Sequence, residues 1–212
     1  PMAPVAARNL CLHKDWLPIS AVGGVNFYVG NNPEADGKFK LVKGIGTGLD
    51  EMVQNSHQMV ESEKGRTVKP SEASSYWMSK GVVFLFSNPS ASLKLYGIKI
   101  FYFLNRYEFP DILDMAFVAQ FIPILYPGIF LYGIAIVLGI HAVWLMRRKK
   151  QWNFRLTFLS VFLLGYMFSV ILFFVTARYR LPAAPILIIF ASYSLVYWLK
   201  VFFGGQEKRF LL

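Results

Sequence analysis

Three long apolar runs in the second half of the chain constrain its fold more than any other feature. They cover about residues 123–145, 156–175 and 181–203. A helix of about 20 apolar residues spans the roughly 30 Å hydrocarbon core of a bilayer, because each residue adds about 1.5 Å. We therefore predict a membrane all-α region over residues 113–212, with three transmembrane helices at these positions.

The composition agrees with a membrane chain. Of the 212 residues, 55% are hydrophobic and 17% are aromatic, which is more apolar than a typical soluble domain. The net charge of +10 does not indicate a nucleic-acid partner, because the basic residues form no surface interleaved with aromatic side chains. Many of them flank the apolar runs, as membrane topology requires. We predict no nucleic-acid partner.

A basic cluster between the first and second apolar runs predicts the orientation. Its members are Arg147, Arg148, Lys149, Lys150 and Arg155. The positive-inside rule places the loop 146–155 in the cytoplasm. Residues 1–112 and the turn between the second and third runs are then expected on the outer side of the membrane.

Residues 1–112 are predicted to form a mixed, mainly helical extracytoplasmic domain. A short strand or extended segment is expected at residues 16–20, and helices at residues 50–64 and 71–87. A third helix, about residues 90–107, is basic and rich in aromatic side chains, so it could lie in the membrane interface or pack in a core.

Single residues add detail to these helices. Ser71 is predicted as the N-cap of the second helix, and Gly65 as the end of the first. His57 has no cysteine or second histidine nearby, so we predict a surface residue rather than a metal ligand. His141, near the end of an apolar run, is predicted to be neutral and hydrogen-bonded.

A stretch rich in turn formers, Gly23–Gly37, carries candidate binding side chains. Its paired glycines, Asn-Asn-Pro and Asp-Gly predict turns. The candidates for contacting sugar hydroxyls are Asn26, Tyr28, Asn31, Asn32, Glu34 and Asp36. The Asn and Asp side chains could instead hold their own loop together through bonds to nearby backbone. The spacing does not match a calcium-binding loop, so we predict no metal site.

The turn between the second and third runs carries Arg178, Tyr179 and Arg180. An arginine at the edge of the hydrocarbon is costly unless it reaches the interface, faces a wet cavity or pairs with an anion. A guanidinium can grip a lipid phosphate through two parallel hydrogen bonds. The alternative is an interfacial anchor assisted by the tyrosine.

Four separated stretches resemble, in the same order, motifs of the bacterial C-type membrane glycosyltransferases. This group includes the protein mannosyltransferases and the lipid A aminoarabinose transferases, often labelled family 39-like. The stretches are Gly23–Gly37, Lys69–Trp77, Asn105–Asp111 and Arg178–Pro185. The resemblance spans nearly the whole chain and implies the C-terminal part of such an enzyme. The family's catalytic acid lies in an earlier outer loop, so no residue of this chain inherits a catalytic role, and we expect this fragment alone to be inactive.

The resemblance also implies the reaction. Such enzymes transfer a sugar from a polyprenyl-phosphate carrier to a glycan, lipid or protein acceptor, on the outer face of the bacterial cytoplasmic membrane. The lipid-linked sugar is the donor substrate, and no cofactor is expected. Arg178 and Arg180, with Tyr179 between them, match the cationic groups that stabilise the departing lipid phosphate.

A second hypothesis comes from a different class of protein. The sequence contains no Ser/His/Asp set, no metal cluster and no phosphate-cradling loop. The chain could therefore belong to a non-catalytic, membrane-anchored protein whose outer domain binds a glycan or a partner in cell-envelope assembly.

Overall fold

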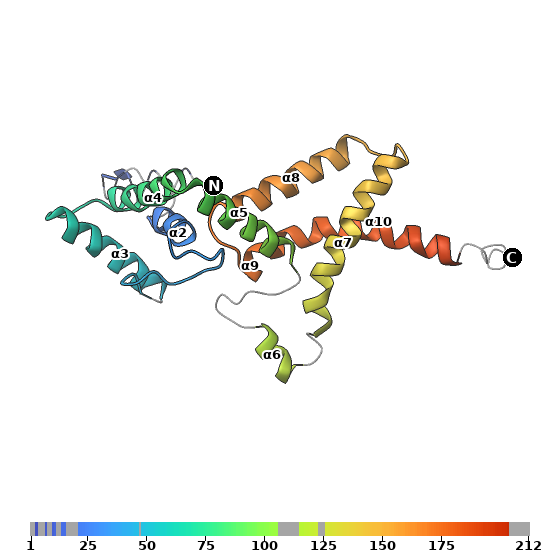
Figure 1. Ribbon diagram of the computed structural model, residues 1–212, viewed down its shortest axis with the longest axis horizontal. Helices are drawn as coiled ribbons and strands as arrows, with labels where there is room; N and C mark the ends of the chain where they lie inside the picture. Colours follow the sequence, from blue (N-terminus) through green and yellow to red (C-terminus); the bar gives the residue numbers. More distant parts are fainter. Residues whose placement is uncertain are drawn as a thin grey trace. The chain divides into compact units, whose positions relative to one another are not determined.

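A computed structural model describes residues 21–46, 48–105, 115–122 and 126–203, together with Ala3, Ala7, Leu10, Cys11, Lys14 and Asp15. The described residues are helical and contain no strand (Figure 1). The strand expected at residues 16–20 lies outside them.

The chain divides into two compact units. The first unit comprises residues 1–99 and 172–174, and the second comprises residues 100–171 and 175–212.

The first unit contains helices α2, α3 and α4 and the beginning of α5. Their bounds are Val22–Gly30, Leu49–Lys64, Pro70–Ser87 and Pro89–Leu104. The predicted helices at residues 50–64 and 71–87 are confirmed. Gly65 ends α3 in the left-handed conformation, with a φ of 64°, as expected for a glycine at this position. The third predicted helix is shorter than expected and ends at Leu104.

The turn predicted at Gly23 and Gly24 was wrong, because both residues lie inside α2. The physical reason is the close approach of α2 to α4. A Cβ on Gly24 would lie 1.8 Å from the backbone oxygen of Ser74. On α4, a Cβ on Gly81 would lie 2.7 Å from the ring of Phe27. Glycine is used here for its missing side chain rather than for a turn.

The predicted N-cap of α4 was also wrong. The helix begins at Pro70, whose fixed φ suits a first helical position, so Ser71 already lies inside the first turn. The backbone N–H of Ser71 donates to the Asp15 carboxylate at 2.9 Å, and the Ser71 hydroxyl donates to the same group. Asp15 is buried, and it supplies the acceptor that the helix end needs from 56 residues earlier in the chain.

The second unit contains the last turn of α5 and the helices that follow. These are α6 Met115–Phe121, α7 Tyr126–Arg148, α8 Phe154–Ile171, α9 Ala177–Arg180, the 3₁₀ turn η2 Leu181–Ala183 and α10 Ala184–Phe203. Three helical segments are long and apolar enough to cross a membrane: Leu131–Arg148, Phe154–Ile171 and Ala177–Phe203.

These segments correspond to the three predicted spans, with shifted bounds. The first segment ends at Arg148 instead of residue 145. The second helix ends at Ile171 instead of near residue 175, and residues 172–174 belong to the first unit. The third apolar segment begins at Ala177 instead of residue 181, because the predicted turn is itself helical.

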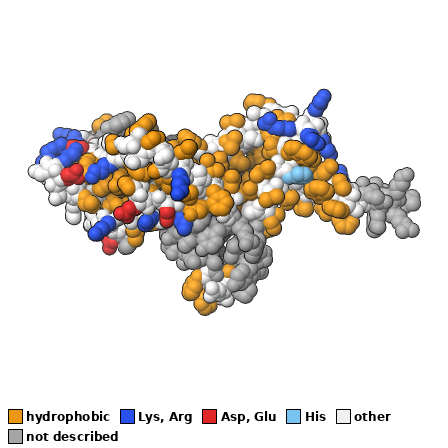
Figure 2. All heavy atoms as spheres, viewed as in Figure 1, with side chains coloured by type: hydrophobic (Ala, Val, Ile, Leu, Met, Phe, Trp, Pro, Cys, Tyr) orange, Lys and Arg blue, Asp and Glu red, His pale blue; other side chains and the backbone are white. Residues whose placement is uncertain are grey.

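The core of the second unit lies along α7 and α10. Ala135 and Ile136 of α7 share one buried cluster with Leu187 and Ala191 of α10. By contrast, only 11% of the residues of α8 are buried within the chain, and many of its large apolar side chains are exposed, among them Phe154, Phe158 and Phe168 (Figure 2). An apolar surface of this kind suits a lipid environment, because the transfer of apolar surface from water to hydrocarbon is favourable.

Two polar side chains inside the second unit, His141 and Ser194, are hydrogen-bonded to each other. Nδ1 of His141 lies 3.0 Å from Oγ of Ser194, and that hydroxyl donates to the Leu138 carbonyl at 2.7 Å. Since the hydroxyl hydrogen is used, the imidazole N–H donates to Ser194. The hydrogen bond expected for His141 is thus confirmed.

The basic cluster lies at the end of α7, where Figure 2 shows Lys and Arg side chains together. Three of its cations lie over aromatic rings: Arg147 over Trp152 at 4.6 Å, Arg148 over Trp144 at 4.5 Å and Lys149 over Tyr197 at 4.1 Å. Cations and amphipathic rings of this kind are enriched where helices meet the membrane–water interface.

Candidate functional site

The predicted arginine turn is one turn of helix at the start of the third apolar segment. It is α9, which follows the extended residue Thr176 and continues through η2 into α10. Residues two apart on a helix are separated by about 200° around its axis. Arg178 and Arg180 therefore point in different directions, and they do not form the paired guanidinium group that the sequence suggested.

Arg180 is buried, with 2% of its surface exposed. Its Nη1 donates to the carbonyl oxygens of Tyr102, at 3.1 Å, and Asn105, at 2.5 Å. Its guanidinium carbon lies 4.8 Å from the centre of the Tyr132 ring. The last carbonyls of a helix lack intrahelical partners and favour a nearby cation. Arg180 therefore joins the end of α5 to the start of the third apolar segment.

Arg178 is exposed. Its guanidinium carbon lies 5.1 Å from the centre of the Tyr179 ring, and its Nη2 donates to the Tyr179 hydroxyl at 3.4 Å. The carbonyl of Tyr179 in turn accepts a hydrogen bond from the Tyr166 hydroxyl at 2.7 Å, which fixes the turn against α8. Of the two arginines, Arg178 is the more exposed.

A small pocket of about 160 Å³ lies beside this turn, within the second unit. Its walls are mainly apolar, from Leu131, Ala135, Leu181 and Ile188, and Arg180 and Tyr132 also line it. The Tyr132 hydroxyl is buried and has no hydrogen-bond partner in the part of the chain that the structure describes. A buried hydroxyl without a partner costs free energy, so a polar group that entered the pocket would be stabilised there.

Two residues of the predicted sugar-binding loop, Asn31 and Asn32, make hydrogen bonds to other parts of the protein. The amide nitrogen of Asn31 donates to the carbonyls of Phe27 and Leu172, both at 2.8 Å, and Asn31 is fully buried. The Asn32 amide nitrogen donates to the Tyr28 carbonyl at 2.9 Å, and its oxygen accepts the Glu34 N–H at 2.8 Å. These contacts are the local and tertiary bonds that the alternative interpretation of the loop requires.

The other four loop residues are more accessible but do not converge. Asn26 and Tyr28 are partly exposed, and the Tyr28 ring packs 5.1 Å from that of Trp77. Glu34 and Asp36 are exposed, and Asp36 accepts the N–H of Lys38 at 3.1 Å. None of the six predicted residues lines the pocket formed by α2, α3 and α4 in the same unit.

The sequence did not single out Lys99, one of the basic residues of the helix that could lie in the membrane interface or pack in a core. The side chain is fully buried, and its Nζ donates to the Asn31 oxygen at 2.9 Å and lies 4.6 Å from the centre of the Tyr96 ring. Burial lowers the pKa of Lys99 to about 7. Its spacing from Leu95 and Phe103, four residues on either side, puts it on the buried face of α5, and that spacing was visible in the sequence.

His57 was expected on the surface and is partly buried instead. Its Nε2 lies 3.0 Å from the carbonyl oxygen of Val68, to which it donates, and its Nδ1 lies 3.8 Å from a carboxylate oxygen of Glu61. Among the described residues, no group of three or more His, Cys, Asp or Glu side chains is placed to hold a metal ion.

Comparison with known proteins supplies no family: the chain matches no protein-family model, no curated protein and no solved structure.

Proposed function

We propose that this chain is part of an integral-membrane glycosyltransferase. The enzyme moves a sugar from a polyprenyl-phosphate carrier to an acceptor on the outer face of the bacterial cytoplasmic membrane. The observation that carries the proposal is the different placement of two neighbouring arginines. Arg178 is exposed at the start of a membrane-length apolar segment, while Arg180 is buried behind it and holds the turn in place.

The chemistry of transfer places negative charge where Arg178 can meet it. An acceptor hydroxyl oxygen attacks the anomeric carbon, the bond from that carbon to the phosphate oxygen breaks, and its electron pair stays on the carrier phosphate. The hydroxyl proton passes to a general base, a role that we assign to no residue of this chain. A guanidinium stabilises the departing phosphate through charge-assisted hydrogen bonds, which strengthen as charge develops.

Two further features support a lipid phosphate as the ligand. The pocket beside the turn has apolar walls that suit the first isoprenoid carbons of a carrier. The four stretches that resemble the C-type glycosyltransferases include this turn, Arg178–Pro185. In the orientation that we propose, residues 1–112 and Arg178 share the outer side of the membrane.

The Arg178→Ala variant is expected to lower sugar transfer by about a hundredfold, the effect of removing one donor to a developing oxyanion. The transfer rate of Arg178→Lys should lie between those of Arg178→Ala and the native protein, because a lysine keeps the charge but loses the paired hydrogen bonds. The measurement is transfer of a radiolabelled sugar from its polyprenyl-phosphate donor, in membranes that carry the whole protein.

The matched control is Lys94→Ala, which removes another exposed cation and should transfer at the native rate. The proposal fails if Arg178→Ala is expressed at the native level and also transfers at the native rate.

A further inference from the structure

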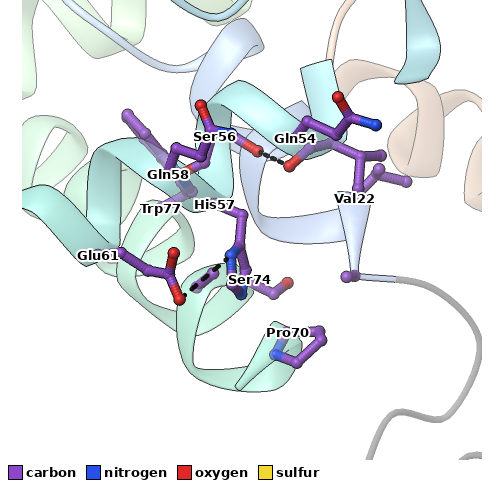
Figure 3. Close-up of a pocket in the computed structure, with 12 residues that line it drawn as sticks. Val22, Gln54, Ser56, His57, Gln58, Glu61, Pro70, Ser74 and Trp77 are labelled. Atoms are coloured by element: carbon purple, nitrogen blue, oxygen red, sulfur yellow. Dashed lines mark hydrogen bonds and ion pairs between the residues drawn. The ribbon is translucent and has the colours of Figure 1, made fainter. Parts of the chain in front are cut away.

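The first unit contains a second pocket, far larger than the one beside the arginine turn. It lies where α3 and α4 meet the beginning of α2, and it has a volume of about 390 Å³ (Figure 3). Pockets that hold small molecules begin at roughly 300 Å³, so this one has room for a ligand. No residue assigned to the transfer site lines it.

The floor of the pocket is held in place by hydrogen bonds between the three helices. Trp77 of α4 is 3% exposed, and its indole N–H donates to the Ser56 carbonyl of α3 at 3.0 Å. The hydroxyl of Ser74 on α4 accepts the N–H of Gly24 on α2, also at 3.0 Å. A pocket built on such bonds is formed before a ligand arrives, which lowers the entropic cost of binding.

Part of the lining is polar, and the backbone of Val68 holds two of its side chains, His57 and Glu61, through hydrogen bonds. The imidazole Nε2–H of His57 donates to the Val68 carbonyl at 3.0 Å, and the Glu61 carboxylate accepts the Val68 N–H at 3.1 Å. Figure 3 shows the His57 ring facing the Glu61 carboxylate. Gln54 and Gln58 stand on the same helix, and their exposed amides make no hydrogen bond within the described chain.

Other lining residues are apolar, among them Val22, Pro70 and Ala73. No lysine or arginine lines the pocket, so it is unsuited to a phosphate or another anion. A ligand that fits has an apolar face and a rim of hydroxyl groups, which is the surface of a sugar ring. Planar amide and carboxylate groups can donate to or accept from neighbouring hydroxyls in pairs. We propose that this pocket binds a neutral sugar residue.

This binding does not depend on the proposed transfer reaction, because it concerns residues of the first unit alone. If both hold, the pocket belongs to the acceptor or to a neighbouring sugar of a glycan acceptor. If transfer fails and sugar binding holds, the chain is a glycan-binding protein of the membrane.

The test is saturation-transfer NMR on the whole protein in lipid nanodiscs. The probes are free glucose, mannose, galactose and N-acetylglucosamine, each measured separately, because free sugars bind such pockets at about millimolar affinity. At least one probe is expected to receive saturation from the native protein. The double variant Gln54→Ala/Gln58→Ala should weaken that binding about tenfold or more.

Two control variants outside the pocket, Gln120→Ala and Glu63→Gln, distinguish a loss of sugar binding in the pocket from a general effect of the substitution. Gln120→Ala removes an exposed amide in the second unit and should bind as the native protein does. Glu61→Gln keeps an acceptor for Val68 but loses the charge, and should weaken binding. Glu63→Gln makes the same change outside the pocket and should not. The proposal is overturned if no probe receives saturation, or if the double variant binds as tightly as Gln120→Ala.

Discussion

The Gly24→Ala variant is expected to lose the native packing of the first unit, whereas Gly23→Ala keeps it. The new Cβ at position 24 would lie 1.8 Å from the Ser74 oxygen and 2.6 Å from its carbonyl carbon, both of them backbone atoms. Backbone cannot rotate away as a flexible side chain can, so α2 and α4 must separate. We expect a loss of about 3 kcal/mol or more in the free energy of unfolding, the upper end for overpacked cores.

Gly23 offers the matched comparison, because it is the preceding residue of the same helix and a Cβ there meets no atom within 4 Å. Alanine in a helix interior is favoured over glycine by about 0.5–1 kcal/mol, so Gly23→Ala should be neutral or slightly stabilising. Hydrogen exchange of the α2 and α4 amides in detergent-solubilised protein measures the difference. Equal protection in the two variants would show that α2 does not approach α4 as closely as described.

The second large effect is expected at Arg180. Arg180→Ala removes two charge-assisted hydrogen bonds, to the carbonyls of Tyr102 and Asn105, and leaves those oxygens without this donor in a buried place. Each hydrogen bond to a charged group contributes about 1.5–3 kcal/mol, so we expect a loss of about 3 kcal/mol or more in stability. Arg180→Lys should recover part of it, because an ammonium can donate to a carbonyl but lacks the fork geometry.

Thermal unfolding of the purified protein in detergent tests this expectation, with Arg178→Ala as the control. Arg178 is exposed, and substitutions of surface residues usually change stability by no more than about 0.5 kcal/mol. Both variants are expected to lose transfer, Arg180→Ala through an unstable turn and Arg178→Ala at native stability. An Arg180→Ala protein that unfolds at the native temperature would contradict the structural role of this residue.

The elements with local sequence signals were predictable. The apolar runs identified all three membrane-length helices, because length and hydrophobicity alone define such segments. Gly65 marked the end of α3 through its own backbone preference.

The errors arose where a distant partner decided the structure. The paired glycines 23 and 24 carry a turn signal, but Gly24 lies in a helix that packs so closely on Ser74, 50 residues later, that no side chain fits there. The cap of α4 comes from Asp15, which nothing near the helix start reveals. Neither the contact of Gly24 with Ser74 nor that of Asp15 with the start of α4 can be predicted from the residues next to it in the sequence.

In the candidate site, too, the sequence predicted what depends on neighbouring residues and missed what depends on distant ones. The sequence singled out Arg178, Tyr179 and Arg180 together, because charge at the edge of an apolar run is unusual. It could not separate the two arginines, since the carbonyls that occupy Arg180 lie 75 and 78 residues earlier. For Asn31 the sequence left open a sugar contact or a bond within its own loop, and it could not indicate the partners Lys99 and Leu172, which come from far along the chain.

The most direct measurement is the thermal stabilisation of the purified protein by polyprenyl phosphate, compared with the matching polyprenol that lacks the phosphate. A ligand that binds only the folded state raises the unfolding temperature, and the increase grows with its concentration. We predict that the phosphate stabilises the native protein more than the alcohol does, and that this difference disappears in Arg178→Ala. Equal stabilisation by phosphate and alcohol, or an undiminished difference in Arg178→Ala, would show that Arg178 anchors the helix at the interface and does not bind the carrier phosphate.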